Sequence, residues 1–403
     1  MKSNKLVKLK SDVKSELIKN ILPFWSTRMV DNENGGFYGR IAVNGHVYTD
    51  ADKGCVLNSR ILWTFSSAYR ILQDPYYLET AAKSKEYILK YFFDNQFNGV
   101  LWLLDHKGNM KDGKKQIYAQ AFTIYALVEY YRVTGDEICL IKAIELFRLI
   151  EKHSFDPILD GYFEAFGREW EPVDDLRLSE KDANEKKTMN THLHILEAYT
   201  NLYRVWKDDF LKQQLGRLIL VFTDKIVNNH TFNLNMFFDE GWNDKTELVS
   251  YGHNIESSWL LYEAALVLGD INLINKVSKI SLRIAESSKE GVMPDGSMIY
   301  EKFFKSGHVD SDRHWWVQAE AVVGFLNAFT LSGKEEFLDM SLSAWKFISD
   351  HVIDRQNGEW FWSVDKNLQP NLKDDKAGFW KCPYHNSRMC LEIIERQHDQ
   401  QVQ

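Results

Sequence analysis

Prolines are scarce in this sequence, with seven among 403 residues, so long helices can run without interruption. No stretch of about 18 uncharged apolar residues occurs, which argues against a membrane-spanning helix. Basic residues form no cluster and the net charge is −8, so neither nucleic acid nor an anionic membrane is expected as the main partner. A neutral small molecule fits this composition better.

Cysteines are also few. Their positions show neither a disulfide framework nor the paired spacing of a metal site: Cys55, Cys139, Cys382 and Cys390. The basic N-terminus is followed by charged residues rather than by the apolar run and cleavage site of a signal peptide. We therefore expect a cytoplasmic protein with reduced, buried thiols.

The sequence contains no Pro-, Gly- or Ser-rich linker and no low-complexity run. Its 44% hydrophobic and 14% aromatic residues are ample for one large core. We expect a single catalytic domain over residues 1–403 that acts as a monomer.

Apolar residues recur with a helical period along nearly the whole chain. The pattern predicts twelve helices, near residues 9–22, 54–73, 76–93, 116–134, 136–153, 185–206, 209–229, 252–268, 270–288, 313–331, 334–353 and 381–398. Very short connections, such as Gly135-Asp136 and Gly269-Asp270, alternate with long ones. The short connections predict antiparallel helix pairs.

Most long connections repeat one theme, an Asx-Gly turn followed by aromatic residues. It occurs at 34–38, 98–102, 160–164 and 357–362 and predicts small β-hairpins. Helix pairs that recur in this way cannot bury their apolar faces alone, so they are expected to stack into a closed ring. The expected fold is an all-α (α/α)6 barrel, with the hairpins over the active-site end.

Four histidine-bearing stretches open helices at regular intervals of roughly 60 to 70 positions. They are 190–194, 251–256, 312–316 and 380–385. Imidazole is well suited to moving protons near neutral pH. The helices that follow the long loops should line the barrel, so their first turns should converge on one site that holds Arg60, Tyr118, Asn190, His194, His253, Glu256, Trp316 and His385.

Spacing adds detail at two of these helices. Asn190 and His194 are four positions apart and share a helix face, whereas His192 points away, so His194 is the expected inward residue. His253 and Glu256 are three apart, close enough for the carboxylate to hold the imidazole. No metal-binding spacing such as H-E-x-x-H accompanies the histidines, and we predict neither a metal nor another cofactor.

Four motifs together resemble the cellobiose 2-epimerase family of the N-acylglucosamine 2-epimerase superfamily. The motifs are Lys181 to His194, Tyr251-Gly252-His253-Asn254-Ile255-Glu256, Trp315 to Ala321 and Trp380-Lys381-Cys382-Pro383-Tyr384-His385. The resemblance covers nearly the whole chain. It implies an (α/α)6 barrel that inverts C2 of the reducing-end glucose in β-1,4-linked disaccharides, including cellobiose and lactose, without a metal or nucleotide.

The resemblance also implies roles for the motif residues. His253 and His385 would be the acid/base pair, and Glu256 would support His253. Oxygens around C1 and C2 would be bound by Arg60, Asn190 and His194. The sugar subsites would be shaped by Tyr118, Asp182, Trp316 and Trp380.

Three alternatives stay open from the sequence. An N-acylglucosamine 2-epimerase or a mannose isomerase would use similar histidines on a monosaccharide. An inverting glycoside hydrolase can share the barrel but needs two carboxyl groups about 6.5–9.5 Å apart, for which Glu164, Glu256 and Glu320 are the candidates. A non-catalytic sugar-binding protein would keep the aromatic residues but would have little use for both His253 and His385.

Overall fold

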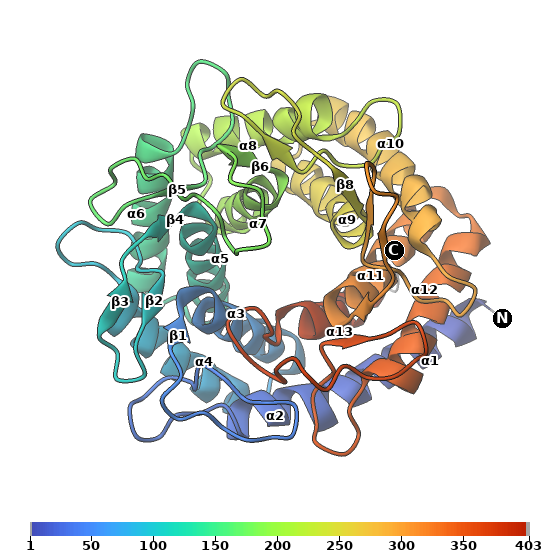
Figure 1. The fold of residues 1–403 in the computed structure, drawn as a ribbon, viewed down its shortest axis with the longest axis horizontal. Coiled ribbons are helices and arrows are strands. Elements are labelled where there is room, and N and C mark those ends of the chain that lie inside the picture. Colours follow the sequence, from blue (N-terminus) through green and yellow to red (C-terminus); the bar gives the residue numbers. More distant parts are fainter. Residues whose placement is uncertain (1, 400–403) are drawn as a thin grey trace.

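Two concentric rings of helices make up the protein in a computed structural model that describes residues 2–399 (Figure 1). The inner ring consists of α3 (Cys55–Leu72), α5 (Ile117–Thr134), α7 (Met189–Val205), α9 (Tyr251–Leu268), α11 (Trp315–Ser332) and α13 (Tyr384–Asp399). The outer ring consists of α1 (Lys2–Glu16), α2 (Leu22–Thr27), α4 (Pro75–Tyr87), α6 (Glu137–His153), α8 (Asp209–Val221), α10 (Ile271–Ser288) and α12 (Glu335–Phe347). The expected (α/α)6 barrel is confirmed.

Short links connect each of the first five inner helices to the outer helix that follows it. After α5 and α9 the chain turns at Gly135 and Gly269, which adopt positive φ angles of 69° and 81°, a conformation that glycine reaches without strain. The next residues, Asp136 and Asp270, accept hydrogen bonds from backbone N–H groups in the first turn of α6 and α10. Such caps stop one helix and start the next within two residues, which produces the antiparallel pairs.

Five of the outer helices, all but α2 and α6, end in a π-helical or 3-10 turn. Four of them continue into single π-helical turns, η1 (Leu17–Ile21), η2 (Ile88–Phe92), η3 (Phe222–Ile226) and η5 (Ile348–Val352), and α10 continues into a 3-10 turn, η4 (Lys289–Gly291). A reversal that begins with an isolated antiparallel bridge then follows in all six repeats, at Val30–Phe37, Phe93–Val100, Phe155–Tyr162, Val227–Leu234, Val292–Met298 and Ile353–Trp360. The Asx-Gly theme had predicted only four of these six.

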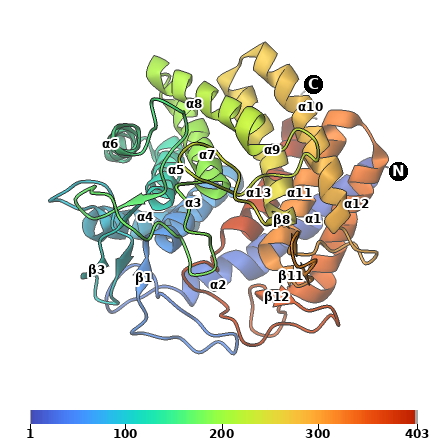
Figure 2. The same cartoon turned by 45° about the horizontal axis from the view of Figure 1, so that its top comes forward.

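Short antiparallel strands connect neighbouring repeats at one end of the barrel (Figure 2). The pairs are β1 (Lys53–Gly54) with β2 (Leu103–Leu104), β2 with β3 (Met110–Asp112), β4 (Lys115–Gln116) with β5 (Ala165–Phe166), β6 (Lys187–Thr188) with β7 (Phe237–Phe238), β8 (Leu248–Ser250) with β9 (Glu301–Phe303), β9 with β10 (Val309–Asp310), and β11 (Arg313–His314) with β12 (Ser363–Val364). Strands β1, β4, β6, β8 and β11 each lead directly into an inner helix. The first turns of the inner helices are thereby fixed at the end of the barrel that carries the long loops.

Buried ion pairs hold several of the reversals. An Asp that opens the turn accepts a hydrogen bond from a buried Lys Nζ in four repeats, at Asp31–Lys53, Asp94–Lys115, Asp156–Lys187 and Asp354–Lys376, over 2.6 to 3.0 Å. The fourth reversal has the neutral Asn228 at this position, where the side chain accepts from backbone N–H groups. A buried charge needs a partner whereas an amide does not, so the cation is present where the turn carries a carboxylate.

The ring closes where α13 packs between α3 and α11, with α1 outside it. Two contacts across this junction are a hydrogen bond from Trp25 Nε1 to Glu359 Oε2 (2.7 Å) and one from Arg60 Nη1 to Cys382 Sγ (3.5 Å). The two ends of the sequence therefore complete one wall of the barrel.

Helix boundaries differ from the prediction mainly at two places. The first helix begins at Lys2 rather than near residue 9, and α7 begins at Met189 rather than near 185. Lys187 and Thr188 are instead drawn into β6 by pairing with Phe237 and Phe238. Among the described residues, no helix combines the length and apolarity needed to cross a bilayer.

Candidate active site

Arg60, Tyr118 and His194 meet at the loop end of the barrel, from α3, α5 and α7. The Arg60 guanidinium is buried, donates to Tyr118 Oη over 2.8 Å and lies 4.2 Å from the Phe122 ring centroid. The His194 ring packs 4.8 Å from Tyr118 and 4.6 Å from Phe122. Both side chains also approach the Tyr384 ring of α13, Arg60 at 4.8 Å and His194 at 6.5 Å. The sequence prediction that His194 faces inward agrees with this placement.

His253 and His385 lie against one tryptophan. Their ring centroids are 4.8 and 5.4 Å from that of Trp316, on α11 between them. Gly252 makes the close approach possible, because a Cβ there would lie 2.5 Å from the Trp316 ring. The two histidines predicted to exchange protons are thereby brought to one place.

The remaining predicted residues lie around these two groups. Asn190 lies in the first turn of α7, and its buried Oδ1 has no hydrogen-bond partner among the described residues. Trp380 is half-buried and packs 5.9 Å from Tyr118 and 6.0 Å from Trp102. Asp182 lies in the long segment between β5 and β6, where its carboxylate accepts from the Ser179 N–H and hydroxyl at 2.9 and 3.0 Å. A buried acceptor without a partner suits a hydroxylated ligand.

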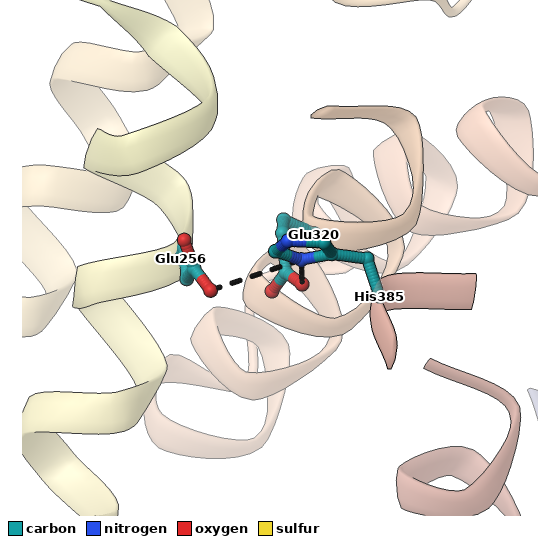
Figure 3. Close-up of side chains that lie close together, drawn as sticks. All are labelled: Glu256, Glu320 and His385. Carbon is teal, nitrogen blue, oxygen red and sulfur yellow. Dashed lines mark hydrogen bonds and ion pairs between the residues drawn. The ribbon is translucent and has the colours of Figure 1, made fainter. Parts of the chain in front are cut away.

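Glu256 does not hold His253, contrary to the prediction from their spacing. The Nδ1 atom of His253 lies 2.8 Å from the Ser250 hydroxyl, at the end of β8. The Glu256 carboxylate instead accepts from Arg388 and lies 3.9 Å from His385 Nδ1. Figure 3 shows Glu256 projecting from α9 toward Glu320 and His385. Glu256 lies about one helical turn further along α9 than His253 and therefore deeper in the barrel. Its carboxylate points toward the barrel axis and not toward His253.

Three charged residues of this deeper level were not identified as part of an epimerase site from sequence. Glu197 Oε2 lies 3.1 Å from His194 Nδ1, and Glu320 Oε1 lies 2.8 Å from His385 Nδ1. Arg388 donates to both carboxylates. The available signal was a charged residue three or four positions after a site residue in an otherwise apolar helix, as in His194 to Glu197, Trp316 to Glu320 and His385 to Arg388.

The site histidines are neutral at neutral pH. Burial lowers the pKa of His194 to about 4 and that of His253 to about 3, and it holds the pKa of His385 well below the usual value. Burial raises the pKa of Glu197, but Arg388 and His194 outweigh this effect and bring it down to about 2. His194 therefore faces an ionised carboxylate, so its proton resides on Nδ1 and its Nε2 can accept.

One group of described residues has the proximity of a metal site, namely Glu256, Glu320 and His385, whose ligand atoms lie within 4.8 Å of one another. Both carboxylates accept hydrogen bonds from Arg388, however. The Arg388 guanidinium therefore already supplies the positive charge that a metal ion would bring. His192 cannot ligate a metal either, because both nitrogens of its ring are hydrogen-bonded to backbone atoms.

The carboxyl pair of an inverting hydrolase is also poorly matched. The oxygens of Glu256 and Glu320 lie within 4.8 Å, closer than the spacing of about 6.5–9.5 Å that leaves room for a water. Glu164 instead stabilises the start of α7. Its carboxylate accepts hydrogen bonds from the Thr188 N–H and the Thr191 hydroxyl, at 2.9 and 2.7 Å. None of the three candidate carboxylates is free to flank a scissile bond.

His192 connects α7 to the preceding loop. Its Nδ1 lies 2.6 Å from the Thr188 carbonyl oxygen, and its Nε2 accepts the Tyr162 N–H over 2.9 Å. Because a carbonyl only accepts and an N–H only donates, the ring is neutral with its proton on Nδ1. Protonation of Nε2 would break the contact with Tyr162.

We expect His192 to make the fold sensitive to acid. Burial lowers its pKa to about 4, whereas an unfolded histidine titrates near 6.5. Between these values the unfolded chain binds a proton that the folded chain does not, so stability falls as the pH decreases, by about 3 kcal/mol at most for this residue. In urea unfolding at pH 7 and pH 4.5, His192→Gln should lose less stability on acidification than the wild type. Replacement of the exposed His230 by Gln is the control, and an unchanged pH dependence in His192→Gln would contradict the assignment.

Comparison with known families decides which of the barrel enzymes this chain is related to. Residues 36–388 match the family model of N-acylglucosamine 2-epimerase (GlcNAc 2-epimerase). The chain belongs to the N-acylglucosamine 2-epimerase family. The matched range includes every site residue described above, from Arg60 to Arg388.

Several members of the N-acylglucosamine 2-epimerase family resemble the chain over nearly its full length. The cellobiose 2-epimerase of Bacteroides fragilis is 54% identical over 386 residues, which cover 96% of this chain and 98% of the relative. That of Ruminococcus albus is 41% identical, with 96% and 98% covered. The solved structure of cellobiose 2-epimerase from Bacillus thermoamylovorans B4167 superposes with a TM-score of 0.93 at 44% identity, covering 96% and 99% of the two chains. These findings confirm the predicted enzyme class, an isomerase that epimerises a carbohydrate.

Proposed function

We propose that this protein reversibly epimerises C2 of the reducing-end glucose of β-1,4-linked disaccharides. Cellobiose would become glucosyl-mannose and lactose would become epilactose. The observation that carries the proposal is the position of His253 and His385 against the same Trp316 ring, which brings two neutral imidazoles to one sugar carbon. The names of the relatives with 41% and 54% identity support the choice of a disaccharide.

The reaction begins once the reducing sugar has opened to its aldehyde. One neutral imidazole removes the hydrogen from C2, the C–H electron pair forms a double bond between C1 and C2, and the carbonyl pair moves onto O1. The other imidazole, which is neutral at rest, takes up a proton from solvent and donates it to the opposite face of C2 while the C1–O1 double bond re-forms. The first imidazole then releases the proton it removed to solvent. Inversion at C2 therefore needs both rings. Either His253 or His385 could serve either face.

The oxyanion on O1 needs a donor in a site that excludes water. Arg60 is the fitting residue, because its guanidinium is buried and carries a fixed charge. His194 faces Glu197 with its Nδ1 proton, so its Nε2 would accept a sugar hydroxyl rather than donate to O1. Asn190 and Tyr118 would bind neighbouring oxygens. Asp182, Trp316 and Trp380 would shape the subsites, since aromatic faces suit the C–H surfaces of sugars.

The wider setting belongs to the same proposal. We infer that residues 1–403 act as one catalytic domain, since all six inner helices or the segments beside them supply site residues. The reaction would need no metal, because the Arg388 guanidinium already donates hydrogen bonds to the clustered carboxylates of Glu256 and Glu320. Four free, buried cysteines suit a reducing cytoplasm, and we propose that the enzyme works there as a monomer.

The test is proton NMR of cellobiose incubated with the purified, EDTA-treated protein in D2O. We expect glucosyl-β-1,4-mannose with deuterium at C2, because the incoming proton comes from a solvent-exchanged imidazole. Unchanged cellobiose together with turnover of N-acetylmannosamine or free mannose would replace the disaccharide by a monosaccharide. Release of glucose would mean that carboxylates carry out a hydrolysis.

A further inference from the structure

A layer of charged residues lies one helical turn below the histidines. Glu197, Glu256, Glu320 and Arg388 come from α7, α9, α11 and α13 and are at most 4% exposed. Three carboxylates and one guanidinium at this depth are costly to bury unless each is paired. Their arrangement therefore has to be explained by what they hold in place.

Arg388 is the centre of this layer. Its Nη1 donates to Glu197 Oε1 over 2.5 Å, and its Nη2 donates to Glu320 Oε1 over 2.6 Å and also to Glu256. The guanidinium is held between the Tyr384 and Trp259 rings, with centroids 4.2 and 4.8 Å away. One planar cation thus fixes carboxylates from three other helices.

Two of these carboxylates also contact histidines of the candidate site. Glu197 meets His194 Nδ1 at 3.1 Å and Glu320 meets His385 Nδ1 at 2.8 Å. Glu320 is also fixed by Trp259 Nε1, which donates to its other oxygen over 3.0 Å. An imidazole whose Nδ1–H donates to an ionised carboxylate keeps its ring orientation and a basic Nε2.

We propose that Arg388 is a positioning residue for the epimerisation, which sets the orientation and basicity of His194 and His385 through Glu197 and Glu320 without touching the sugar. This inference rests on the proposed function and deepens it. The continuous path is His194, Glu197, Arg388, Glu320 and His385, so a single guanidinium would coordinate two histidines on opposite walls of the barrel.

The charge balance supports this role. Burial and the Glu320 carboxylate raise the pKa of Glu256, and Arg388 opposes that rise. Burial also raises the pKa of Glu320, and Arg388 opposes that rise. Removing the cation would raise the pKa of Glu256 and Glu320 further and would reverse part of the lowering at Glu197. A protonated carboxyl group is a weaker acceptor for an imidazole N–H, so the histidines would lose their support first at low pH.

The variant Arg388→Met tests the proposal, because it removes the charge and keeps an unbranched side chain beside Trp259. We expect kcat for cellobiose epimerisation to fall about tenfold or more and the acidic limb of the pH profile to move upward by about one unit or more, with KM changed less. Arg388→Lys should recover part of both effects, since it restores the charge but not the forked geometry.

Arg396→Met is the matched control on the same helix. Arg396 also lies over the Trp259 ring, at 5.3 Å, but it donates to Glu392 and Asn327 rather than to the three central carboxylates. Its replacement should lower thermal stability and leave the pH profile unchanged.

Each outcome bears on the proposal. A folded Arg388→Met with the wild-type pH profile would make Arg388 merely structural and overturn it. If Arg388→Met does not fold, the pH profile of Arg388→Lys decides in the same way, and an unshifted acidic limb overturns the proposal. Failure of the proposed function is seen separately, as absence of cellobiose epimerisation by the wild-type protein.

Discussion

Replacing His385 by alanine is expected to lower the rate of epimerisation by about 10²- to 10⁴-fold, the usual contribution of a positioned acid or base. The fold should survive, because Glu320 keeps Arg388 and Trp259 as partners when the imidazole is lost. The same loss is expected for His253→Ala. Turnover of cellobiose followed by NMR, with circular dichroism to confirm folding, measures both effects.

Hydrogen exchange separates the two histidines further. A variant with one base can still remove the C2 hydrogen from the epimer that presents it to that base, and can return deuterium to the same face without inversion. His253→Ala and His385→Ala should therefore exchange C2 of opposite epimers in D2O. His153→Ala, on the outer helix α6, is the control and should epimerise normally. Wild-type rates in either site variant, or exchange of the same epimer by both, would sink the two-base assignment.

Arg60→Met is expected to lower kcat by about 10²- to 10³-fold, because an oxyanion donor of this kind typically contributes that much. Methionine can still pack against Phe122 and Tyr384, the rings that flank the guanidinium, so the loss should reflect charge rather than packing. Steady-state kinetics on cellobiose, with thermal unfolding as a check, measure the effect.

Tyr118→Phe provides the comparison for Arg60. It removes the oxygen that accepts from Arg60 Nη2 but leaves the guanidinium charged and in place, so it should cost much less activity. A larger effect from Tyr118→Phe than from Arg60→Met would move the oxyanion role to the phenol.

Hydrophobic periodicity and turn residues were sufficient to predict the barrel. Helices α9 and α10 could be placed because Gly269 and Asp270 mark the link between them in the sequence itself. The first residue of α7 was harder to predict, because the local sequence at Lys187 and Thr188 is compatible with a helix. Lys187 pairs with Phe238 and Thr188 with Phe237. These partners are 51 and 49 positions apart, so no local sequence pattern can reveal the pairing.

In the candidate site too, features that depend on one helix were predictable, whereas contacts between helices were not. The placement of His253 and His385 at the loop end of the barrel was predictable because each opens an inner helix within a recognisable motif. The partners of these histidines were not, because the Glu256 carboxylate reaches across the axis to Arg388 and His385 takes its carboxylate from α11. Helical spacing identifies neighbours within one helix, whereas contacts between helices depend on how deep each side chain lies in the assembled ring.

The closure of the ring by α13 has a consequence for how activity arises during synthesis. Arg60 and Cys382, whose side chains meet at the junction, are 322 positions apart in the chain. Contacts of such separation form late because the loop between them must first be ordered. A nascent chain that has folded five helical hairpins still lacks His385, Arg388 and the wall between α11 and α3. We therefore expect catalytic competence to appear in one step, when the final helix docks.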